Sequence, residues 1–336
     1  MSNTTLRRLL ACLSDGELHS GKALGETLGV SRAAVWKHIQ QAQLLGLPIS
    51  AQKGLGYHLP MALQLLDADD IRQHLLPAAR SALASIDVLF SVDSTNNYAL
   101  ERLRAGADQP FAVLAEMQTA GRGRRGRTWH SPFACHIYLT LGWRCRQGLS
   151  ALEGLSLVAG LQLLESLQAT GFPELQLKWP NDLLWRQRKL AGVLIDVQGD
   201  PAGDCQVALG IGLNVHSLAT DTGLVPIDQP WTSLQQVAET LSCPLPSRNA
   251  LVAELLNRLL PAIHHMEQEG FAPYRAAWQS HDYCFGQRLR VQAGNSAWEG
   301  VGAGVNGQGA YLLDTAQGQQ AVSGGEISLR PQVAVA

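Results

Sequence analysis

The sequence contains no apolar run close to the roughly 20 residues that a membrane-spanning helix needs. Its first residues meet acidic and polar positions too early to form the apolar core of a signal peptide. The six cysteines are scattered and include no CxxC pair, which fits neither a zinc site nor a secreted disulfide framework. We therefore expect a reduced, cytoplasmic protein with no metal site built by its own side chains.

Charge is also scarce. Charged residues make up 16% of the 336 positions and the formal net charge is −2, whereas soluble proteins typically contain about 25% charged residues. A uniformly basic nucleic-acid coat is excluded, but a local basic patch is not. Apolar residues make up 46%, which excludes wholesale disorder. At roughly 100–200 residues per domain, the length predicts two or three domains.

The beginning of the chain has the pattern of a helix-turn-helix unit. Leucines at helical spacing predict a helix over residues 4–12, and a second helix can start at Ser20. A tight turn over residues 29–31 follows, in which Ser31 is placed to cap a third helix. That third helix has one apolar face for packing and a second face, which we expect to enter the major groove of DNA.

Residues 49–59 predict two short strands around a Gly-Leu-Gly turn, which together form a wing. Residues 1–66 hold six basic and three acidic residues, a net charge of +3, which leaves −5 for the remainder. This asymmetry favours a phosphate-binding surface at the N-terminus. A small helical protein-interaction module is the alternative. The expected DNA-binding residues are Ser31, Arg32, Ala33, Trp36, Lys37, Gln40 and Lys53.

Two predicted strands in the middle of the chain end in polar segments. The strand over 86–92 runs into the short side chains of 93–97, which either bind a small polar ligand or cap the next helix. The strand over 112–117 ends in the loop 118–129, where glycine and arginine alternate. Such a loop suits an anion and should repel itself into disorder when empty. A solvated basic loop or an RNA-binding RGG-like segment is the alternative.

Two further predicted strands also lead into candidate site residues. The strand over 175–177 runs into the motif KWPND, so that Lys178 and Asp182 emerge at the strand end, and Lys189 follows seven residues later. A set of this kind is usually a surface salt bridge, but here buried-strand sequence on both flanks favours a site. The strand over 207–211 continues into a glycine-containing segment, where we expect the backbone to approach a ligand closely.

The last third of the chain changes character. Pro261 is expected to kink or break the helix that follows Glu254. Residues 283–330 consist of short alternating segments separated by glycine turns, which predicts a small antiparallel β-barrel. A generic interaction cap is the alternative. We thus expect an α/β (α+β) multidomain protein with domains at 1–66, 67–282 and 283–336.

Six motifs together resemble the bifunctional biotin–protein ligase and biotin-operon repressor family of bacteria. They are STNNY (94–98), QTAGRGRRGRTW (118–129), KWPND (178–182), RKLAG (188–192), GIGLNV (210–215) and GGEISLR (324–330). The match covers nearly the whole chain, and the Gly-Arg loop with KWPND distinguishes it from lipoate ligases. The resemblance implies a winged helix-turn-helix, a mixed-sheet ligase domain and an SH3-like β-barrel. In the wing, Gly-Leu-Gly-Tyr stands where the family often has a further basic residue.

The resemblance implies two reaction steps. Biotin reacts with ATP to give biotinyl-5′-adenylate and pyrophosphate, and a lysine of the biotin carboxyl carrier protein of acetyl-CoA carboxylase then attacks the mixed anhydride. Neither step requires an enzyme nucleophile, but both need positioning and neutralisation of phosphate charge, with Mg²⁺ accompanying the triphosphate. The adenylate-bound homodimer is expected to bind operator DNA and repress the biotin biosynthesis operon. This nucleotide-binding ligase would then also act in transcription regulation.

The resemblance also assigns residues, motif by motif. The expected catalytic residues are Lys178, Arg124, Asp182 and Lys189. Biotin or its acyl-phosphate is expected at Ser94, Thr95, Asn96, Gln118, Arg122, Gly123, Arg124 and Lys178. The adenylate is expected at Arg124, Arg125, Trp129, Asn181, Asn214 and Trp231, of which Trp231 has equal claim to be a core residue.

Three other functions stay open on the sequence. They are a pure transcription regulator that only senses biotin, a ligase with weak or no repressor activity, and a lipoate or other acyl ligase. The complete Gly-Arg loop together with Lys178 argues against the pure regulator, because a sensor has no need for adenylation chemistry.

Overall fold

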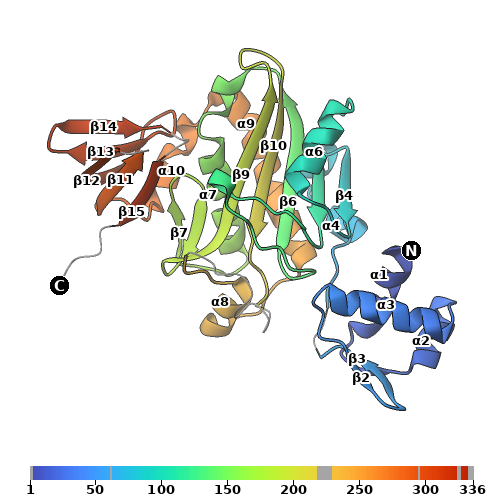
Figure 1. Cartoon of the computed structure of the whole chain (residues 1–336). Coiled ribbons are helices and arrows are strands. Elements are labelled where there is room, and N and C mark those ends of the chain that lie inside the picture. Colours follow the sequence, from blue (N-terminus) through green and yellow to red (C-terminus); the bar gives the residue numbers. More distant parts are fainter. Residues whose placement is uncertain (1–2, 61–62, 218–228, 294–295, 324–326, 332–336) are drawn as a thin grey trace.

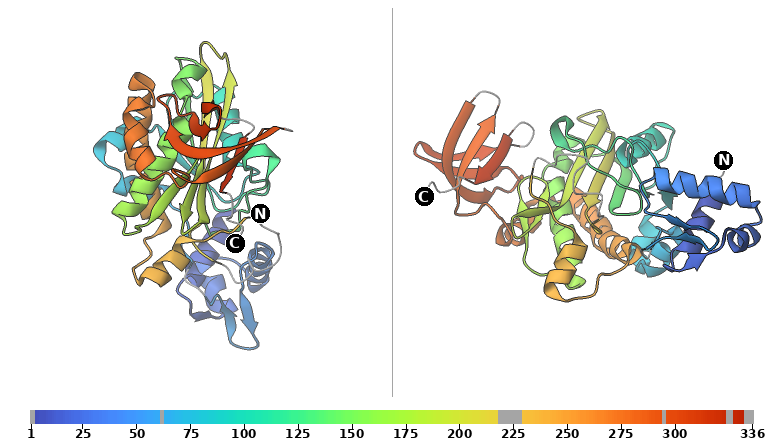
Figure 2. Two further views of the ribbon diagram at one scale, coloured as in Figure 1. Left: turned by 90° about the vertical axis from the view of Figure 1, so that its left-hand side faces the viewer. Right: turned by 60° about the horizontal axis from the view of Figure 1, so that its bottom comes forward.

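The computed structural model describes residues 3–60, 63–217, 229–293, 296–323 and 327–331. A helical N-terminal unit, a central sheet flanked by helices and a C-terminal sheet follow one another in space (Figure 1). The N-terminal unit and the C-terminal sheet lie at opposite ends of the molecule (Figure 2). Within the described ranges, every helix is too short or too polar to cross a membrane.

The N-terminal unit is a winged helix-turn-helix, as predicted. Ser20 and Ser31 cap its second and third helices by accepting hydrogen bonds from the backbone N–H groups of Ala23 and Ala34, at 3.1 and 3.2 Å. Gly29 ends the second helix in the left-handed conformation, at φ 68°. The elements are α1 (Asn3–Leu13), β1 (Leu18–His19), α2 (Gly21–Leu28), α3 (Arg32–Leu44), β2 (Ser50–Gln52) and β3 (Gly56–His58), with strand order β1-β3-β2.

The central unit contains a mixed seven-stranded sheet in the order β4-β5-β6-β10-β9-β8-β7. Only the β4–β5 pair is parallel, and the other pairs are antiparallel. This arrangement leaves β4 and β7 at the two edges. The strands are β4 (Ser85–Leu89), β5 (Phe111–Ala115), β6 (Ile137–Cys145), β7 (Leu175–Lys178), β8 (Asp182–Trp185), β9 (Arg188–Gly199) and β10 (Cys205–Leu213).

Helices cover both faces of this sheet. Leu114 of β5 and Leu209 of β10 belong to a hydrophobic cluster with α7 and α9, whereas Val113 and Ala208 belong to a separate cluster with α6. Because neighbouring residues of a strand point to opposite faces, α6 lies on the face opposite to α7 and α9. The helices are α4 (Ala68–His74), α5 (Pro77–Ala82), α6 (Thr95–Arg104), α7 (Leu155–Ala169), α8 (Leu234–Leu241), α9 (Arg248–Glu269) and α10 (Arg275–Ser280).

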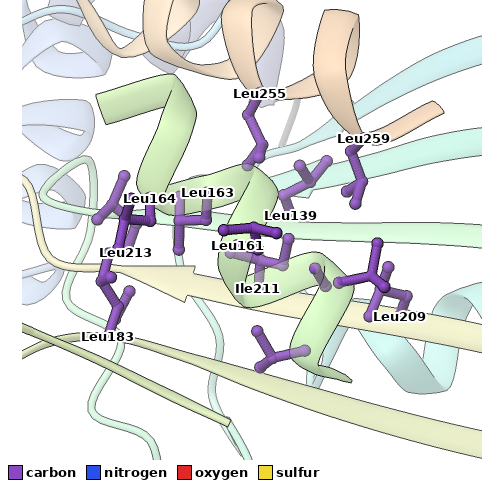
Figure 3. Packing of buried hydrophobic residues seen from close by; sticks show 14 of the residues in the cluster. Leu139, Leu161, Leu163, Leu164, Leu183, Leu209, Ile211, Leu213, Leu255 and Leu259 are labelled. Atoms are coloured by element: carbon purple, nitrogen blue, oxygen red, sulfur yellow. The ribbon is translucent and has the colours of Figure 1, made fainter. Parts of the chain in front are cut away.

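Of the predicted kink or break at Pro261, the break is wrong, because helix α9 continues through the proline to Glu269. Leu259 and Ile263, on either side of the proline, are both buried in the cluster that α9 shares with α7. Figure 3 shows Leu255 and Leu259 of α9 close to the leucines of α7 and the strands beneath them. This packing offsets the one backbone hydrogen bond that a proline removes from a helix.

The C-terminal sheet is antiparallel throughout, in the order β14-β13-β12-β11-β15. The predicted turn at 306–307 joins β12 to β13, whereas the turns at 294–295 and 324–325 lie outside the described residues. Leu289, Val305 and Leu313 continue the central hydrophobic cluster. The strands are β11 (Arg288–Ala293), β12 (Ser296–Val305), β13 (Tyr311–Thr315), β14 (Gly318–Val322) and β15 (Ile327–Pro331).

Candidate functional site

A cavity of about 660 Å³ lies on the central sheet, a volume in the range of small-molecule and cofactor sites. All the residues predicted to act in catalysis or to bind biotin or the adenylate line this cavity. They are Ser94, Thr95, Asn96, Gln118, Arg122, Gly123, Arg124, Arg125, Trp129, Lys178, Asn181, Asp182, Lys189, Asn214 and Trp231.

One wall is a polar network at the start of α6. The backbone N–H and the hydroxyl of Thr95 both donate to Oε1 of Gln118, at 2.9 and 3.1 Å, and Nε2 of Gln118 donates to Ser131 Oγ at 3.0 Å. The hydroxyl oxygen of Thr140 lies 2.8 Å from Thr95 Oγ1 and 2.7 Å from Asn96 Oδ1. These bonds fix the amide orientations, so the wall presents defined donors and acceptors to a ligand.

Ser94 occupies the N-cap position of α6, but its side chain makes no capping hydrogen bond. It is almost completely buried and lines the cavity. The alternative, in which the Ser94 side chain caps the helix, is therefore excluded.

The Gly-Arg loop forms a tight turn over the cavity. The N–H of Gly123 donates to the carbonyl of Arg127 at 2.7 Å, and a short 3₁₀ turn, η1 (Arg124–Gly126), closes the tip. Arg125 adopts φ 60° and is exposed. On the side facing α6, the guanidinium of Arg122 donates to Asn97 Oδ1 and Asp196 Oδ2, at 2.7 and 2.8 Å. The loop therefore has one arginine anchored to the sheet.

Arg124 points to the opposite side of the loop, where its Nη1 donates to Asn181 Oδ1 at 3.3 Å. Burial lowers the pKa of Arg124. The positive charges of Arg125 and Arg127 lower this pKa further, whereas the nearby carboxylate of Asp182 raises it. Because an arginine remains protonated in proteins, the side chain keeps its positive charge at the cavity.

The KWPND motif forms the tight hairpin between β7 and β8, in which Lys178 pairs with Asp182 across the turn. Lys189 Nζ lies 2.7 Å from Asp182 Oδ1, with each side chain 15% exposed, and 5.4 Å from the centre of the Trp129 ring. This ion pair lies inside the cavity and is largely shielded from solvent. The alternative of an ordinary surface salt bridge is therefore excluded by its position.

Glycines form the floor beneath two of these side chains. A Cβ atom at Gly212 of β10 would lie 2.5 Å from Cε2 of Trp129, and one at Gly210 would lie 2.3 Å from Asn96 Oδ1. The sequence predicts that the backbone of residues 210–215 approaches a ligand closely. In the structure, the side chains of Trp129 and Asn96 make this close approach. Both glycines also line the cavity.

The face of α3 that we expect to contact DNA is open. Trp36 is 53% exposed, and Lys37 and Gln40 are exposed beside it. Val35, Ile39 and Ala42 are buried as predicted, together with His38, which the apolar pattern did not indicate. The other predicted DNA contacts, Ser31, Arg32, Ala33 and Lys53, are exposed as well.

Residues 88–214 match the Biotin/lipoate A/B protein ligase family, and residues 5–58 match an HTH domain. The chain is 41% identical over 334 residues to the bifunctional ligase/repressor BirA of Salmonella typhimurium, which covers 98% of this chain and 99% of that protein. It is 40% identical over 331 residues to the BirA protein of Escherichia coli, which covers 98% of each chain. The chain belongs to the family of bifunctional biotin ligases and repressors.

A solved structure agrees with this membership. The biotin protein ligase from Aquifex aeolicus, in complex with biotin and ATP, is 26% identical and superimposes with a TM-score of 0.62. The similarity covers 74% of this chain and 100% of that one. The Aquifex ligase is therefore matched over its whole length, whereas 26% of this chain lies outside the match.

Sequence reasoning missed two residues that line the cavity of this ligase/repressor, His136 and Tyr138, and two that hydrogen-bond its lining residues, Thr140 and Asp196. His136, Tyr138 and Thr140 lie before and along β6, and Asp196 lies on β9. Tyr138, Thr140 and Arg144 occupy alternate positions of a strand whose other residues are apolar or glycine, a signal that should have placed all three on the face toward α6. Asp196 Oδ2 accepts from Asn96 Nδ2 at 2.9 Å as well as from Arg122, a role that only the folded chain reveals.

Proposed function

We propose that this ligase activates biotin with ATP to biotinyl-5′-adenylate and transfers the biotin to a lysine of a biotin carboxyl carrier protein. The observation that carries the proposal is that a single cavity joins a fixed polar wall, a Gly-Arg loop and the Lys178–Asp182 hairpin. The names of relatives support it: the chain is 36% identical, over 247 residues, to the biotin–[acetyl-CoA-carboxylase] ligase of Paracoccus denitrificans.

The polar wall is the proposed biotin site. The ureido ring of biotin carries one carbonyl acceptor and two N–H donors, and Ser94, Thr95, Asn96 and Gln118 offer both partner types. Because Gln118 is held by Thr95 and Ser131, little side-chain freedom is lost when the ligand binds. The backbone of Gly123 completes this proposed set from the loop.

The cations above the wall serve the phosphate chemistry. The biotin carboxylate attacks the α-phosphorus of ATP, an oxygen–phosphorus bond forms, and pyrophosphate leaves. Arg122, Arg124 and Lys178 would neutralise the charge on the phosphate oxygens during this exchange. The side chains need only hold the two reactants in line, because no group of the enzyme is consumed.

Mg²⁺ is expected to accompany the triphosphate. In the described part of the chain, no three His, Cys, Asp or Glu side chains gather as metal ligands, and the cavity carboxylate Asp182 is paired with Lys189. We therefore propose that phosphate oxygens and water supply most of the ligands to this ion.

Trp129 and Trp231 are the proposed walls of the adenine site, with Arg125, Asn181 and Asn214 at its rim. Trp231 pairs with Lys189 through a backbone bridge and is half-buried at the cavity. In the second step, the amine of the carrier lysine attacks the acyl carbon and AMP leaves. The Asp182–Lys189 pair would orient the adenylate or this incoming amine.

The second activity that we propose is repression of a biotin biosynthesis operon by an adenylate-bound homodimer. One winged helix-turn-helix with a net charge of +3 makes few phosphate contacts, so tight operator binding calls for two half-sites. If the adenylate favours the dimer, DNA must favour adenylate binding by the same factor. ATP and operator DNA would place both activities in the cytoplasm.

The decisive experiment supplies the full chain with ATP and a biotin carboxyl carrier domain and detects the added biotin mass. We expect transfer with biotin and none with lipoate, and lipoate transfer would replace the proposal with an acyl ligase of that type. Failure to form an adenylate would leave only a sensing regulator. Sedimentation and operator titration, each with and without biotinyl-adenylate, test repression. A protein that stays monomeric and binds operator DNA with unchanged affinity would contradict the proposed repressor activity.

A further inference from the structure

The segment that leads into the C-terminal sheet pairs with the edge of the central sheet next to Lys178. Strand β7 is an edge strand, and the segment 281–283 pairs with it. The N–H of Leu177 donates to the carbonyl of His281 at 2.8 Å, and the N–H of Tyr283 donates to the carbonyl of Leu177 at 2.9 Å. The residue before Lys178 is therefore held by backbone bonds from the segment that leads into the C-terminal sheet.

The residue after Lys178 is held by the C-terminal sheet itself. Trp179 is buried, and its indole Nε1–H donates to the carbonyl of Gly309 at 2.9 Å, in the turn between β12 and β13. Its ring centroid lies 5.9 Å from that of Tyr311, the first residue of β13. Leu177 and Trp179 are both buried, and Lys178 lines the cavity together with Trp179. The lysine is therefore fixed from both sides by its neighbours in the chain.

Tyr311 connects these two attachments. Its side chain is fully buried, and its hydroxyl donates to Asp282 Oδ2 at 2.9 Å, while Asp282 Oδ1 accepts from the N–H of Cys284 at 2.9 Å. The hydroxyl packs tightly against β12, since a Cβ atom at Gly302 would lie 2.5 Å from it. One aromatic side chain therefore contacts both the segment that pairs with Leu177 and the ring of Trp179.

We propose that Tyr311 is a positioning residue for adenylation, which sets the place of Lys178 in the cavity through Asp282 and Trp179. The inference rests on the proposed role of Lys178 at the phosphates. A displacement of about 1 Å in a reacting geometry can reduce a rate roughly a hundredfold. The C-terminal sheet thus contributes to the chemistry of the central cavity through a residue that touches no substrate.

The test compares two conservative variants with a matched control, in the full chain. Tyr311→Phe removes the hydroxyl, with its bond to Asp282 and its backbone contact at Gly304, and Trp179→Phe removes the indole bond to Gly309 together with part of the buried ring system. Leu313→Val is the control, since it trims a buried residue of the same strand without touching either bond. For each protein, biotin-dependent ATP–pyrophosphate exchange gives kcat and KM, and thermal unfolding gives Tm.

We expect both aromatic variants to lower the kcat of adenylation about tenfold while the KM for biotin stays within about twofold. The double variant should be no slower than the slower single variant, because both act on one lysine. Leu313→Val should lower Tm without lowering kcat. Wild-type kcat in both aromatic variants, or an equal loss of kcat in Leu313→Val, overturns the inference. If the wild-type protein forms no adenylate, the proposed function falls first, and the inference falls with it.

Discussion

The guanidinium of Arg248 and the carboxylate of Glu116 form an ion pair at 2.8 Å, with both side chains completely buried. Arg248 also donates to the carbonyl of His136 at 3.1 Å and to that of Gln64, while Glu116 Oε1 accepts from the N–H of Leu66 at 2.6 Å. This pair therefore ties the chain that leaves the DNA-binding unit to the end of β5 and to a wall of the cavity.

Replacing one partner of this pair should strongly destabilise the protein. Glu116→Gln leaves the Arg248 charge buried without compensation, so we expect the free energy of unfolding to fall by about 3–5 kcal/mol. Urea unfolding measures the change. Glu174→Gln breaks the exposed pair with Arg186 and should change the free energy by less than ~1 kcal/mol. Equal effects of the two variants would contradict this account.

Lys178→Ala should strongly lower the rate of adenylation. Loss of one cation at the reacting phosphate is worth about 2–4 kcal/mol in the transition state, or roughly two to three decades in rate. Single-turnover formation of biotinyl-adenylate is the measurement. Arg186→Ala, which removes an exposed cation outside the cavity, is the matched control. A normal rate in Lys178→Ala would show that the lysine has been assigned the wrong role.

The Gly-Arg loop should become protected when ligands bind. Arg122, Arg124, Arg125 and Arg127 repel one another within a few residues, and an anion removes that repulsion. Limited trypsin digestion of the free protein should cut within residues 121–127, and biotin with ATP should slow that cleavage. Identical cleavage with and without ligands would count against an anion-ordered loop.

Gly212→Ala should impair the use of ATP more than the binding of biotin. The new Cβ atom would lie 2.5 Å from Cε2 of the Trp129 ring, which forces the indole away from the floor of the cavity. We expect a KM for ATP raised about tenfold or more, following a loss of ~1.4 kcal/mol in binding. Gly307→Ala, where a Cβ atom meets nothing within 4 Å, is the control. An unchanged KM for ATP in Gly212→Ala would remove Trp129 from the adenine site.

Asp282 should make stability depend on pH. Burial raises its pKa from 3.8 to about 6, against the hydrogen bonds from Cys284 and Tyr311. The titratable groups around it are Tyr311 of β13 and Cys284 of its own segment, with Lys178 of β7 acting on the Cys284 thiol.

Because the folded state binds this proton more tightly than the unfolded state, Asp282 contributes stability at low pH that is lost as pH rises from about 4 to 6. At 1.36 kcal/mol per pKa unit, the loss amounts to about 1–3 kcal/mol. Asp282→Asn should abolish it, so the stability of this variant relative to wild type should increase over that interval. Unfolding curves of the two proteins that stay parallel from pH 4 to 7 would refute the prediction.

Features that depend on neighbouring residues were predictable from the sequence. Ser31 caps α3 and the leucines of α1 are buried because capping and helical periodicity act within a few positions of the chain. The sequence also placed Lys178 and Asp182 at the end of a strand, and the two residues do lie together, on either side of the β7–β8 turn, since only three residues separate them. The domain limits at 66 and 282 stay predictions. The hydrophobic cluster of the N-terminal unit also includes Phe90 and Phe133, which lie beyond residue 66 in the sequence.

Relations between distant segments were decided only by the tertiary structure. Glu116 and Arg248 are 132 positions apart and Trp179 and Gly309 are 130 apart, so no periodicity or spacing links them. Pro261 remains inside α9 because packing against α7 outweighs the local preference to end the helix. The family motifs determined which residues meet at the cavity, but the energy of burying and pairing distant groups determined how the C-terminal sheet holds Lys178 in place.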